Sequence, residues 1–406
     1  MKVLYTTIAI ICFSITASAQ GKWTKKLDLP DSLRIEACSF SALGKGYLVG
    51  GRHGTNYFKD VWEFDATNNT WTKKNNFGGP ARREGVAFTI NGKGYVGTGR
   101  DAAGAMKDFW EYDPTNDTWT KKADYPGGVR RDATGFSVGN KGYIGTGQDP
   151  NGTVNKNDFW EYDPSTDQWT QKLNFPGAAR NAAIGFSVGN KGYIGLGRAS
   201  NSEYSDIWEF DPTTNKWTQK LALTPGTREE VVSFTIGNIA YIGTGYSSTP
   251  AGNKNDFWAF DPTANTWTKI DTLLGVARQE ATSFEIGGKG YIATGFGAAS
   301  AQKDLWEYDP STKNIGIDDA SSNNILLYPN PVNHQVTLEL SNNIKQEIIS
   351  IHIYTADGKE CPTPTYKYTL KDNNIYIETD NLANGLYILN VSLPNKVISM
   401  KVAVVR

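Results

Sequence analysis

An arginine stands six residues ahead of a phenylalanine in each of six similar stretches of the chain. Five of these stretches carry a carboxylate two residues after the arginine, and the fourth has Ala182 there. Residues two apart in an extended strand point to the same side, so we expect both sets of side chains to line one surface. The arginines are Arg34, Arg82, Arg130, Arg180, Arg228 and Arg278, and the acids are Glu36, Glu84, Asp132, Glu230 and Glu280.

Guanidinium groups and carboxylates at this spacing have the chemistry to bind a ligand. Arginine makes paired hydrogen bonds to anionic or hydroxyl-rich molecules, and aromatic rings add flat apolar surface. Segments that follow the second expected strand of each stretch should return to the same face; they contain Arg52 and His53, Arg100, Gln148, Arg198, Tyr246 and Phe296. We therefore predict a site for a glycan or a protein ligand, made of the eleven residues above with Arg100, Arg198 and Tyr246.

A structural role is the alternative for the same charges. Charges crowded around a narrow ring must be paired, because an unpaired buried charge costs several kcal/mol. The arginines would then tie neighbouring repeats together, and Ala182 would mark the place where one of them stays free. Glu230 lies beside Glu229, and like-charge crowding raises the pKa of a carboxyl. Glu230 and Arg228 are therefore the catalytic candidates if the protein is an enzyme.

No metal site and no cofactor are predicted. An aspartate precedes the third expected strand of every repeat, which is typical of a loop cap. The loops around Asn151–Gly152 and 253–256 have calcium-ligand residue types but lack the EF-hand spacing. His53 is the one histidine between residues 20 and 310, and no Ser-His-Asp triad can be defended there.

The elements that position these residues follow from two columns of tryptophan. Trp62 begins one column, in segments of the type WEYD, and Trp23 begins the other, in which each tryptophan precedes a threonine. Successive members lie about 48 to 50 residues apart, and the two columns of six account for all 12 tryptophans. Each repeat also has a glycine-rich GKGY-type segment, and all repeats but the first have an Asp-Pro turn, so each is predicted to form four short β-strands.

Residues 20–310 resemble the kelch family of β-propellers, with GTG in most repeats where the family usually has two glycines. The resemblance implies an all-β, six-bladed propeller with four-stranded blades. The WT column begins before any first strand, and the WEYD column ends at Trp306 without a WT partner. The strand around Trp23 should therefore complete the last blade and close the ring. Kelch-containing galactose oxidases need two histidines and a Tyr–Cys crosslink for copper, a set that this propeller does not have.

The chain changes character after Pro310. Residues 311–322 are polar and read as a linker, and residues 323–406 alternate like the strands of a small β-sandwich. Tyr328–Pro331, Tyr354–Gly358 and Asn384–Tyr387 resemble the type A C-terminal sorting domain of the type IX secretion system of Bacteroidetes-type bacteria. That resemblance implies passage across the outer membrane and a partner in the secretion machinery. An ordinary terminal adhesion sandwich is the alternative.

The first 19 residues read as an export signal, with Lys2, an apolar core and an Ala17-Ser18-Ala19 cleavage pattern. The protein is thus expected to be secreted or held at the cell surface, without a membrane span. A net charge of −1 argues against nucleic acid. Cys38 and Cys361, which fall in different domains, predict no disulfide, and a monomer is expected.

Three hypotheses about function follow. The first is an exported binding module that recognises a glycan or protein at the loop-rich mouth of the propeller. The second is an enzyme, because the chain resembles the six-bladed kelch mutarotases that interconvert the anomers of sialic acid and use charged mouth residues. The third is a purely structural surface protein.

Overall fold

The computed structural model describes residues 21–200, 202–311, 325–328, 332–340, 350–355, 359–362, 367–371, 374–393 and 396–405. The expected export signal over 1–19 lies outside these residues, as does the linker after residue 311. Chain contacts divide the protein into two compact units, 1–312 and 313–406. No described residues form a helix long and apolar enough to cross a membrane.

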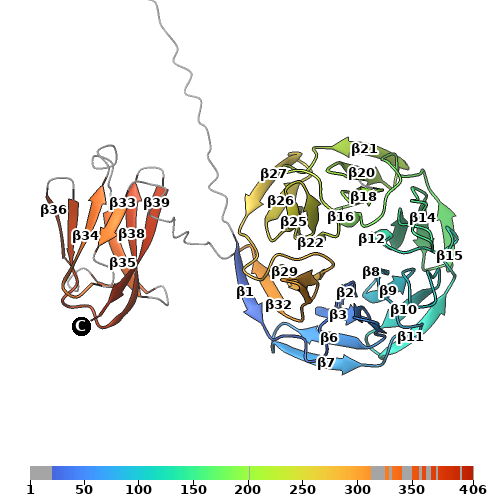
Figure 1. The fold of residues 1–406 in the computed structure, drawn as a ribbon, viewed down its shortest axis with the longest axis horizontal. Helices are drawn as coiled ribbons and strands as arrows, with labels where there is room; N and C mark the ends of the chain where they lie inside the picture. Colours follow the sequence, from blue (N-terminus) through green and yellow to red (C-terminus); the bar gives the residue numbers. More distant parts are fainter. Residues whose placement is uncertain are drawn as a thin grey trace, which may run out of the picture. The chain divides into compact units, whose positions relative to one another are not determined.

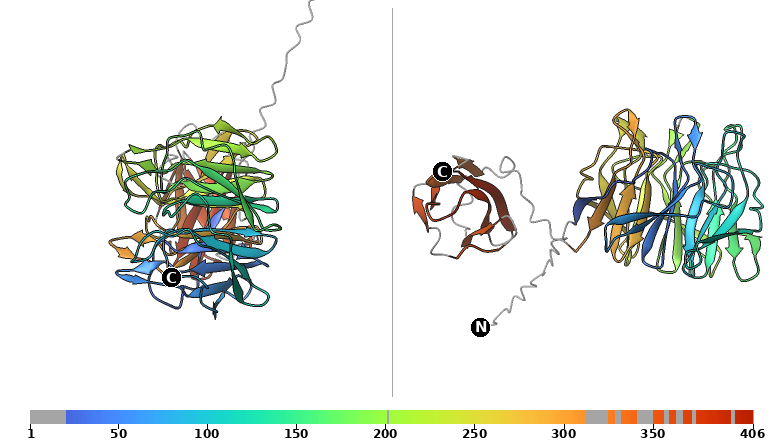
Figure 2. Two further views of the ribbon diagram at one scale, coloured as in Figure 1. Left: turned by 90° about the vertical axis from the view of Figure 1, so that its right-hand side faces the viewer. Right: turned by 90° about the horizontal axis from the view of Figure 1, so that it is seen from below.

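Six four-stranded antiparallel sheets of the first unit form a ring of blades (Figure 1). Four short hairpins extend the connections between the second and third strands of blades 1, 4, 5 and 6. In Figure 2 the strands run between the two faces of the ring. The blades are β2(Cys38–Ala42), β3(Lys45–Val49), β6(Val61–Asp65) and β7(Thr70–Lys74); β8(Val86–Ile90), β9(Lys93–Gly97), β10(Phe109–Asp113) and β11(Thr118–Lys122); β12(Thr134–Val138), β13(Lys141–Gly145), β14(Phe159–Asp163) and β15(Gln168–Gln171); β16(Ile184–Val188), β17(Lys191–Gly195), β20(Ile207–Asp211) and β21(Lys216–Lys220); β22(Val232–Ile236), β23(Ile239–Gly243), β26(Phe257–Asp261) and β27(Thr266–Ile270); and β28(Thr282–Ile286), β29(Lys289–Ala293), β32(Leu305–Asp309) and β1(Lys22–Lys26). The hairpins are β4(Arg52–His53) with β5(Asn56–Tyr57), β18(Arg198–Ala199) with β19(Ser202–Glu203), β24(Tyr246–Ser248) with β25(Ala251–Asn253), and β30(Phe296–Gly297) with β31(Ser300–Ala301).

The innermost strands alternate between the blade interface and the central channel. In β2 the side chains of Cys38, Phe40 and Ala42 are buried, and the serines between them are half-buried. Each innermost strand contacts the innermost strands of both neighbouring blades, and β2 contacts β28, which closes the circle. The second glycine of the GKGY segment is required by this packing. A Cβ on Gly94, for example, would overlap the ring of Phe40 from the preceding blade.

The ring is closed by the strand at the start of the described chain. β1 pairs with β32 in antiparallel register, with Trp23 opposite Tyr308. Trp23 is only 2% exposed, and its indole N–H donates to the carbonyl of Asp271 in blade 5 at 2.9 Å. Without β1, the third strand of blade 6 would be left as an unpaired edge, so closure protects it. The prediction that the Trp23 strand completes the last blade is confirmed.

The second unit contains two sheets, as the sandwich prediction required. Their inward residues share one core, in which Val336 and Ile377 come from one sheet and Ile353, Leu389 and Met400 from the other. Two of the three segments that resemble the sorting domain, Tyr328–Pro331 and Tyr354–Gly358, lie partly outside the described residues. The sheets are β33(Ile325–Tyr328), β34(Gln335–Leu340), β37(Asn374–Glu378) and β36(Lys367–Lys371), and β35(Ser350–Thr355), β38(Gly385–Leu393) and β39(Lys396–Val404).

Candidate functional site

The six repeated arginines lie inside the blades. Their exposure is between 0% and 3%, and each pairs with the aspartate that precedes the third strand of its own blade at 2.5–2.9 Å. The same aspartates accept a hydrogen bond from the indole N–H of the tryptophan two residues later, as Asp304 does from Trp306 at 2.7 Å. Each arginine carbonyl also accepts from a glycine of the preceding blade, as Arg82 does from Gly51 at 2.8 Å. The Arg–Asp–Trp triads stabilise the individual blades, and the bonds from glycine to the arginine carbonyl join neighbouring blades.

This burial corrects the predicted placement of the arginines at the channel mouth. The residue two positions after each arginine has a positive φ of 51° to 58°, so the chain is not extended there and the rule of alternating sides does not apply. Arginine and acid therefore point to different places. The gap at Ala182 does not free Arg180, which pairs with Asp206 at 2.5 Å. The arginines corrected in this way are Arg34, Arg82, Arg130, Arg180, Arg228 and Arg278.

The predicted acids do come together. Their side chains line one cavity of about 160 Å³ at the end of the channel. Backbone N–H groups of five of these positions donate to the carbonyl of the equivalent residue in the preceding blade at 3.0–3.3 Å, beginning with Glu36 to Glu280. We call these six positions the acidic ring and the face around them the mouth. The acidic ring consists of Glu36, Glu84, Asp132, Ala182, Glu230 and Glu280.

Burial and mutual repulsion raise the pKa values of most of these carboxyls. Burial raises the pKa of Glu84 to about 8, and the charges of Asp132 and Glu36 add to the effect. Burial and the charge of Glu36 raise the pKa of Asp132 to about 6 and that of Glu280 to about 7. Burial, followed by the charges of Glu280 and Glu229, raises the pKa of Glu230 well above its ordinary value. The ring therefore holds protons near neutral pH and has both donors and acceptors.

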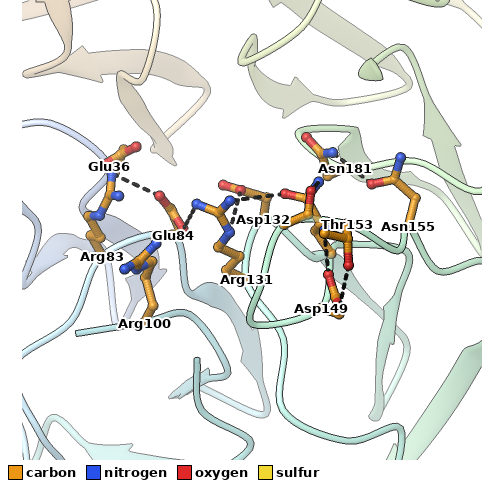
Figure 3. A network of polar contacts seen from close by, with 12 residues as sticks. Glu36, Arg83, Glu84, Arg100, Arg131, Asp132, Asp149, Thr153, Asn155 and Asn181 are labelled. Atoms are coloured by element: carbon orange, nitrogen blue, oxygen red, sulfur yellow. Dashed lines mark hydrogen bonds and ion pairs between the residues drawn. The ribbon is translucent and has the colours of Figure 1, made fainter. Parts of the chain in front are cut away.

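Arginines compensate the ring on one side of the mouth. Arg52 donates to Glu36 at 3.1 Å, and Arg83 bonds to Glu36 and lies 2.8 Å from Glu84. Arg131 continues the row, 3.7 Å from Glu84 and 4.0 Å from Asp132. Figure 3 shows the row from blade 1 to blade 3, in which carboxylates alternate with guanidinium groups: Glu36, Arg83, Glu84, Arg131 and Asp132. Each of the three carboxyl groups in this arc therefore has an arginine within 4.0 Å.

The opposite arc of the ring is acidic, and fewer arginines lie near its carboxyl groups. Arg198 lies 2.9 Å from Glu229, but no described residue forms a hydrogen bond or ion pair with the side chain of Glu230. The nearest polar partner of Glu280 is the amide of Gln279 at 3.5 Å. Protonation is thus the main way in which Glu230 and Glu280 avoid unfavourable buried charge.

The three predicted loop residues lie next to the acidic ring. Arg100 exchanges two backbone hydrogen bonds with Arg83, and Tyr246 does the same with Glu229, at 2.9–3.0 Å. Arg198 is fixed in this way to Asn181. Within the described residues Arg100 makes no ion pair, and the side chain of Arg198 is 48% exposed. Both have donors available to a ligand.

Four further mouth residues were not in the predicted set: Arg52, Arg83, Arg131 and Glu229. Three of them occupy the position between the buried arginine and the acid, which differs in every blade except the second and third. It holds Ile35, Arg83, Arg131, Asn181, Glu229 and Gln279. The position after each buried arginine varies although the rest of the repeat is regular, and this variation could have identified these residues as part of the site.

Among the described residues, no group of three or more His, Cys, Asp or Glu side chains is arranged to hold a metal ion. The carboxylate of Asp149, beside the calcium-candidate loop at Asn151, accepts from the backbone N–H groups of Thr153 and Val154 at 2.7 and 2.9 Å. That carboxylate caps its own loop.

Comparisons with known proteins agree with this architecture. Residues 326–405 match the family described as secretion system C-terminal sorting domain, and residues 44–78 match the kelch motif. No curated protein matches the chain at a significant level. A solved structure described as "Structure of YjhT" is similar with a TM-score of 0.58 and 16% identity, over 69% of this chain and 96% of that one. The propeller therefore carries a kelch motif in its first blade, and the C-terminal sorting domain indicates type IX secretion to the cell surface or the extracellular space.

Proposed function

We propose that the propeller is an exported binding module that recognises a glycan at its mouth. One observation carries the proposal: the acidic ring and the residues beside it gather hydrogen-bonding side chains of both charges around a single opening, and several keep donors or acceptors unused. Arg100 and Arg198 have free N–H groups, and the protonated carboxyls of the ring can both donate and accept. Hydroxyl-rich molecules need this mixture of donors and acceptors.

A concave mouth favours a glycan over a flat protein surface. The face has a cavity of about 160 Å³ in the acidic ring and a second of about 450 Å³ beside it. Tyr246 and Phe296 add aromatic surface at the rim, and such rings pack against the apolar faces of sugars.

A glycan array probed with the mature chain from residue 20 tests this proposal. Arg100→Ala and Arg198→Ala should each weaken binding to the same glycans, because both remove donors from the mouth. Leu43→Ala is the matched control, since Leu43 is 63% exposed in the β2–β3 turn at the other end of the blade. Binding that is unaffected by both arginine substitutions, or no binding at all, would refute the proposal.

A sugar mutarotase is the second candidate, and Glu230 is the observation that favours it. Its carboxyl lines the acidic ring, lacks a partner among the described residues and has a strongly raised pKa because of burial. Opening a sugar ring needs a proton donor at the ring oxygen and an acceptor at the anomeric hydroxyl. Glu230 would be the donor, and Asp132, with a pKa of about 6, would be the acceptor. Arg228 leaves the catalytic set because it is buried against Asp256.

NMR exchange spectroscopy of N-acetylneuraminate distinguishes the two candidates. If the protein is a mutarotase, the mature chain should accelerate anomer exchange, and Glu230→Gln should abolish the acceleration. Leu43→Ala is the control, because Leu43 is exposed in the β2–β3 turn, away from the mouth. Exchange at the uncatalysed rate in the presence of the wild-type chain would eliminate the enzyme.

A further inference from the structure

A second cavity lies beside the acidic ring, where blade 6 meets blade 1. It measures about 450 Å³ and is bordered by the hairpins β4–β5 and β30–β31. We call it the seam pocket. Its volume falls within the range of small-ligand sites, about 300–1,000 Å³, whereas the acidic-ring cavity of about 160 Å³ is below it.

The seam pocket exists because the blade 6 hairpin is small. Only Ala298 and Ala299 separate its two strands, and both have positive φ, 49° and 65°. Gly297 packs so closely on the carbonyl of Ala277 that a Cβ would overlap it. With glycine, alanine and serine after Phe296, little side-chain volume fills the space towards blade 1.

Phe296 forms the apolar wall of the pocket and is held in place. It is 37% exposed, and its backbone exchanges hydrogen bonds with Gln279 at 2.7 and 3.0 Å. The side-chain amide of Asn253 donates to the Phe296 carbonyl at 3.0 Å. These bonds fix the backbone of Phe296, so the strand that carries the aromatic side chain needs no reordering when a ligand binds.

The polar wall is balanced in charge. Arg52 borders the pocket, but its charge is already paired with Glu36 at 3.1 Å. Gln279 and Ser300 contribute neutral donors and acceptors, and the side chain of His53 also lines the pocket. An anionic ligand would meet Glu280 and a cationic one would meet Arg52, so neither sign of charge is favoured.

Glu280 connects this pocket to the mouth. It borders both the seam pocket and the acidic-ring cavity. A ligand that occupies the seam pocket could therefore extend further units across the channel opening, towards Arg83 and Arg100.

We propose that the seam pocket holds one neutral pyranose unit of the glycan, stacked on Phe296, with its hydroxyls bonded to Arg52, Gln279 and Glu280. The inference rests on the proposed glycan-binding function and locates its main sugar subsite away from the propeller axis. An apolar wall opposite a charge-neutral polar wall matches the two kinds of surface of a pyranose ring.

Titration of the mature chain with methyl pyranosides by saturation-transfer NMR tests the proposal. The probes are the methyl glycosides of glucose, galactose and mannose, with methyl glucuronide and methyl glucosaminide as the charged comparisons. At least one neutral glycoside should bind more tightly than both charged ones. Phe296→Ala should weaken it tenfold or more, which corresponds to about 1.4 kcal/mol.

Two further variants keep this experiment decisive. Ser300→Trp fills the pocket from its exposed rim without removing Phe296, and it should also abolish binding. Leu43→Ala should leave binding unchanged, and thermal unfolding checks that each variant is folded. Tighter binding of the glucuronide or the glucosaminide would overturn the proposal, as would equal binding by Phe296→Ala.

The array experiment separates failure of this inference from failure of the proposed function. If glycan binding is lost in Arg100→Ala and Arg198→Ala but retained in Phe296→Ala, the mouth binds glycans and the seam pocket is not the subsite. If no sugar binds in either experiment, both proposals fall.

Discussion

Arg130 and Arg131 are adjacent in the chain and have opposite roles. Arg130 is fully buried and pairs with Asp158 at 2.7 Å inside its own blade. Arg131 is partly exposed at the mouth and lies 3.7 to 4.0 Å from two carboxylates of the acidic ring. The first occurs in all six blades, and the second column changes from blade to blade. The buried arginine column stabilises every blade in the same way, whereas the neighbouring column adds different side chains to the mouth in most blades.

The largest expected effect on the free energy of unfolding comes from replacing Arg130, and replacing Arg131 gives the comparison. Arg130→Ala leaves the Asp158 carboxylate without its partner and should lower the free energy of unfolding by about 3 kcal/mol. Arg131→Ala should cost about 1 kcal/mol or less, because its ion pairs are long and Glu84 can take up a proton. Urea denaturation followed by tryptophan fluorescence measures both. Equal losses would show that the two columns do not differ in role.

Replacing a carboxyl of the acidic ring should change the free energy of unfolding by a smaller amount, and this change should depend on pH. The pKa of Glu280 in the folded chain is about 7, above its ordinary value of 4.5, so the folded state retains a proton that the unfolded state has released. Its ionisation therefore reduces stability as pH rises from about 4.5 to above 7. Glu280→Gln should stabilise the propeller by about 1–2 kcal/mol at pH 8 and have little effect at pH 4.

Ala182→Glu provides the reciprocal variant. It adds a sixth carboxyl to the ring, so it should destabilise the propeller at pH 8 and do so less at pH 4. Denaturation midpoints of both variants across this pH range are the measurement. If Glu280→Gln lost stability at pH 8, repulsion within the ring would not be its dominant interaction.

The smallest effect on stability is predicted for Arg100. Its guanidinium has no carboxylate partner among the described residues, so Arg100→Ala should change the free energy of unfolding by less than about 0.5 kcal/mol. The same denaturation assay detects a larger change. A loss comparable to that of Arg130→Ala would place Arg100 with the residues that hold the ring.

The repeat predicted most of the fold. Twelve tryptophans in two offset columns specified four strands per blade and located the seam at Trp23, because β-structure of this kind depends on a regular pattern of large and small side chains. The GKGY glycines were informative for the same reason, since each one admits a phenylalanine of the preceding blade.

The site was harder to predict because one backbone angle decides it. Glu36 and its counterparts adopt positive φ although none is glycine or asparagine, so no residue type indicated the bend. The rule of alternating sides then grouped the acids with the wrong arginines. Arg83 and Arg131 were overlooked because they do not recur in the other blades, and the seam pocket depends on a hairpin whose small residues looked unremarkable.

The main-chain hydrogen bonds that link the acidic ring from Glu36 to Glu230 have a consequence for how such a protein diversifies. Because carbonyls and amides set the spacing between blades there, the aperture keeps its width whichever side chains are presented around it. Single loops or ring residues can therefore be exchanged to change ligand specificity while the backbone around the opening keeps its dimensions.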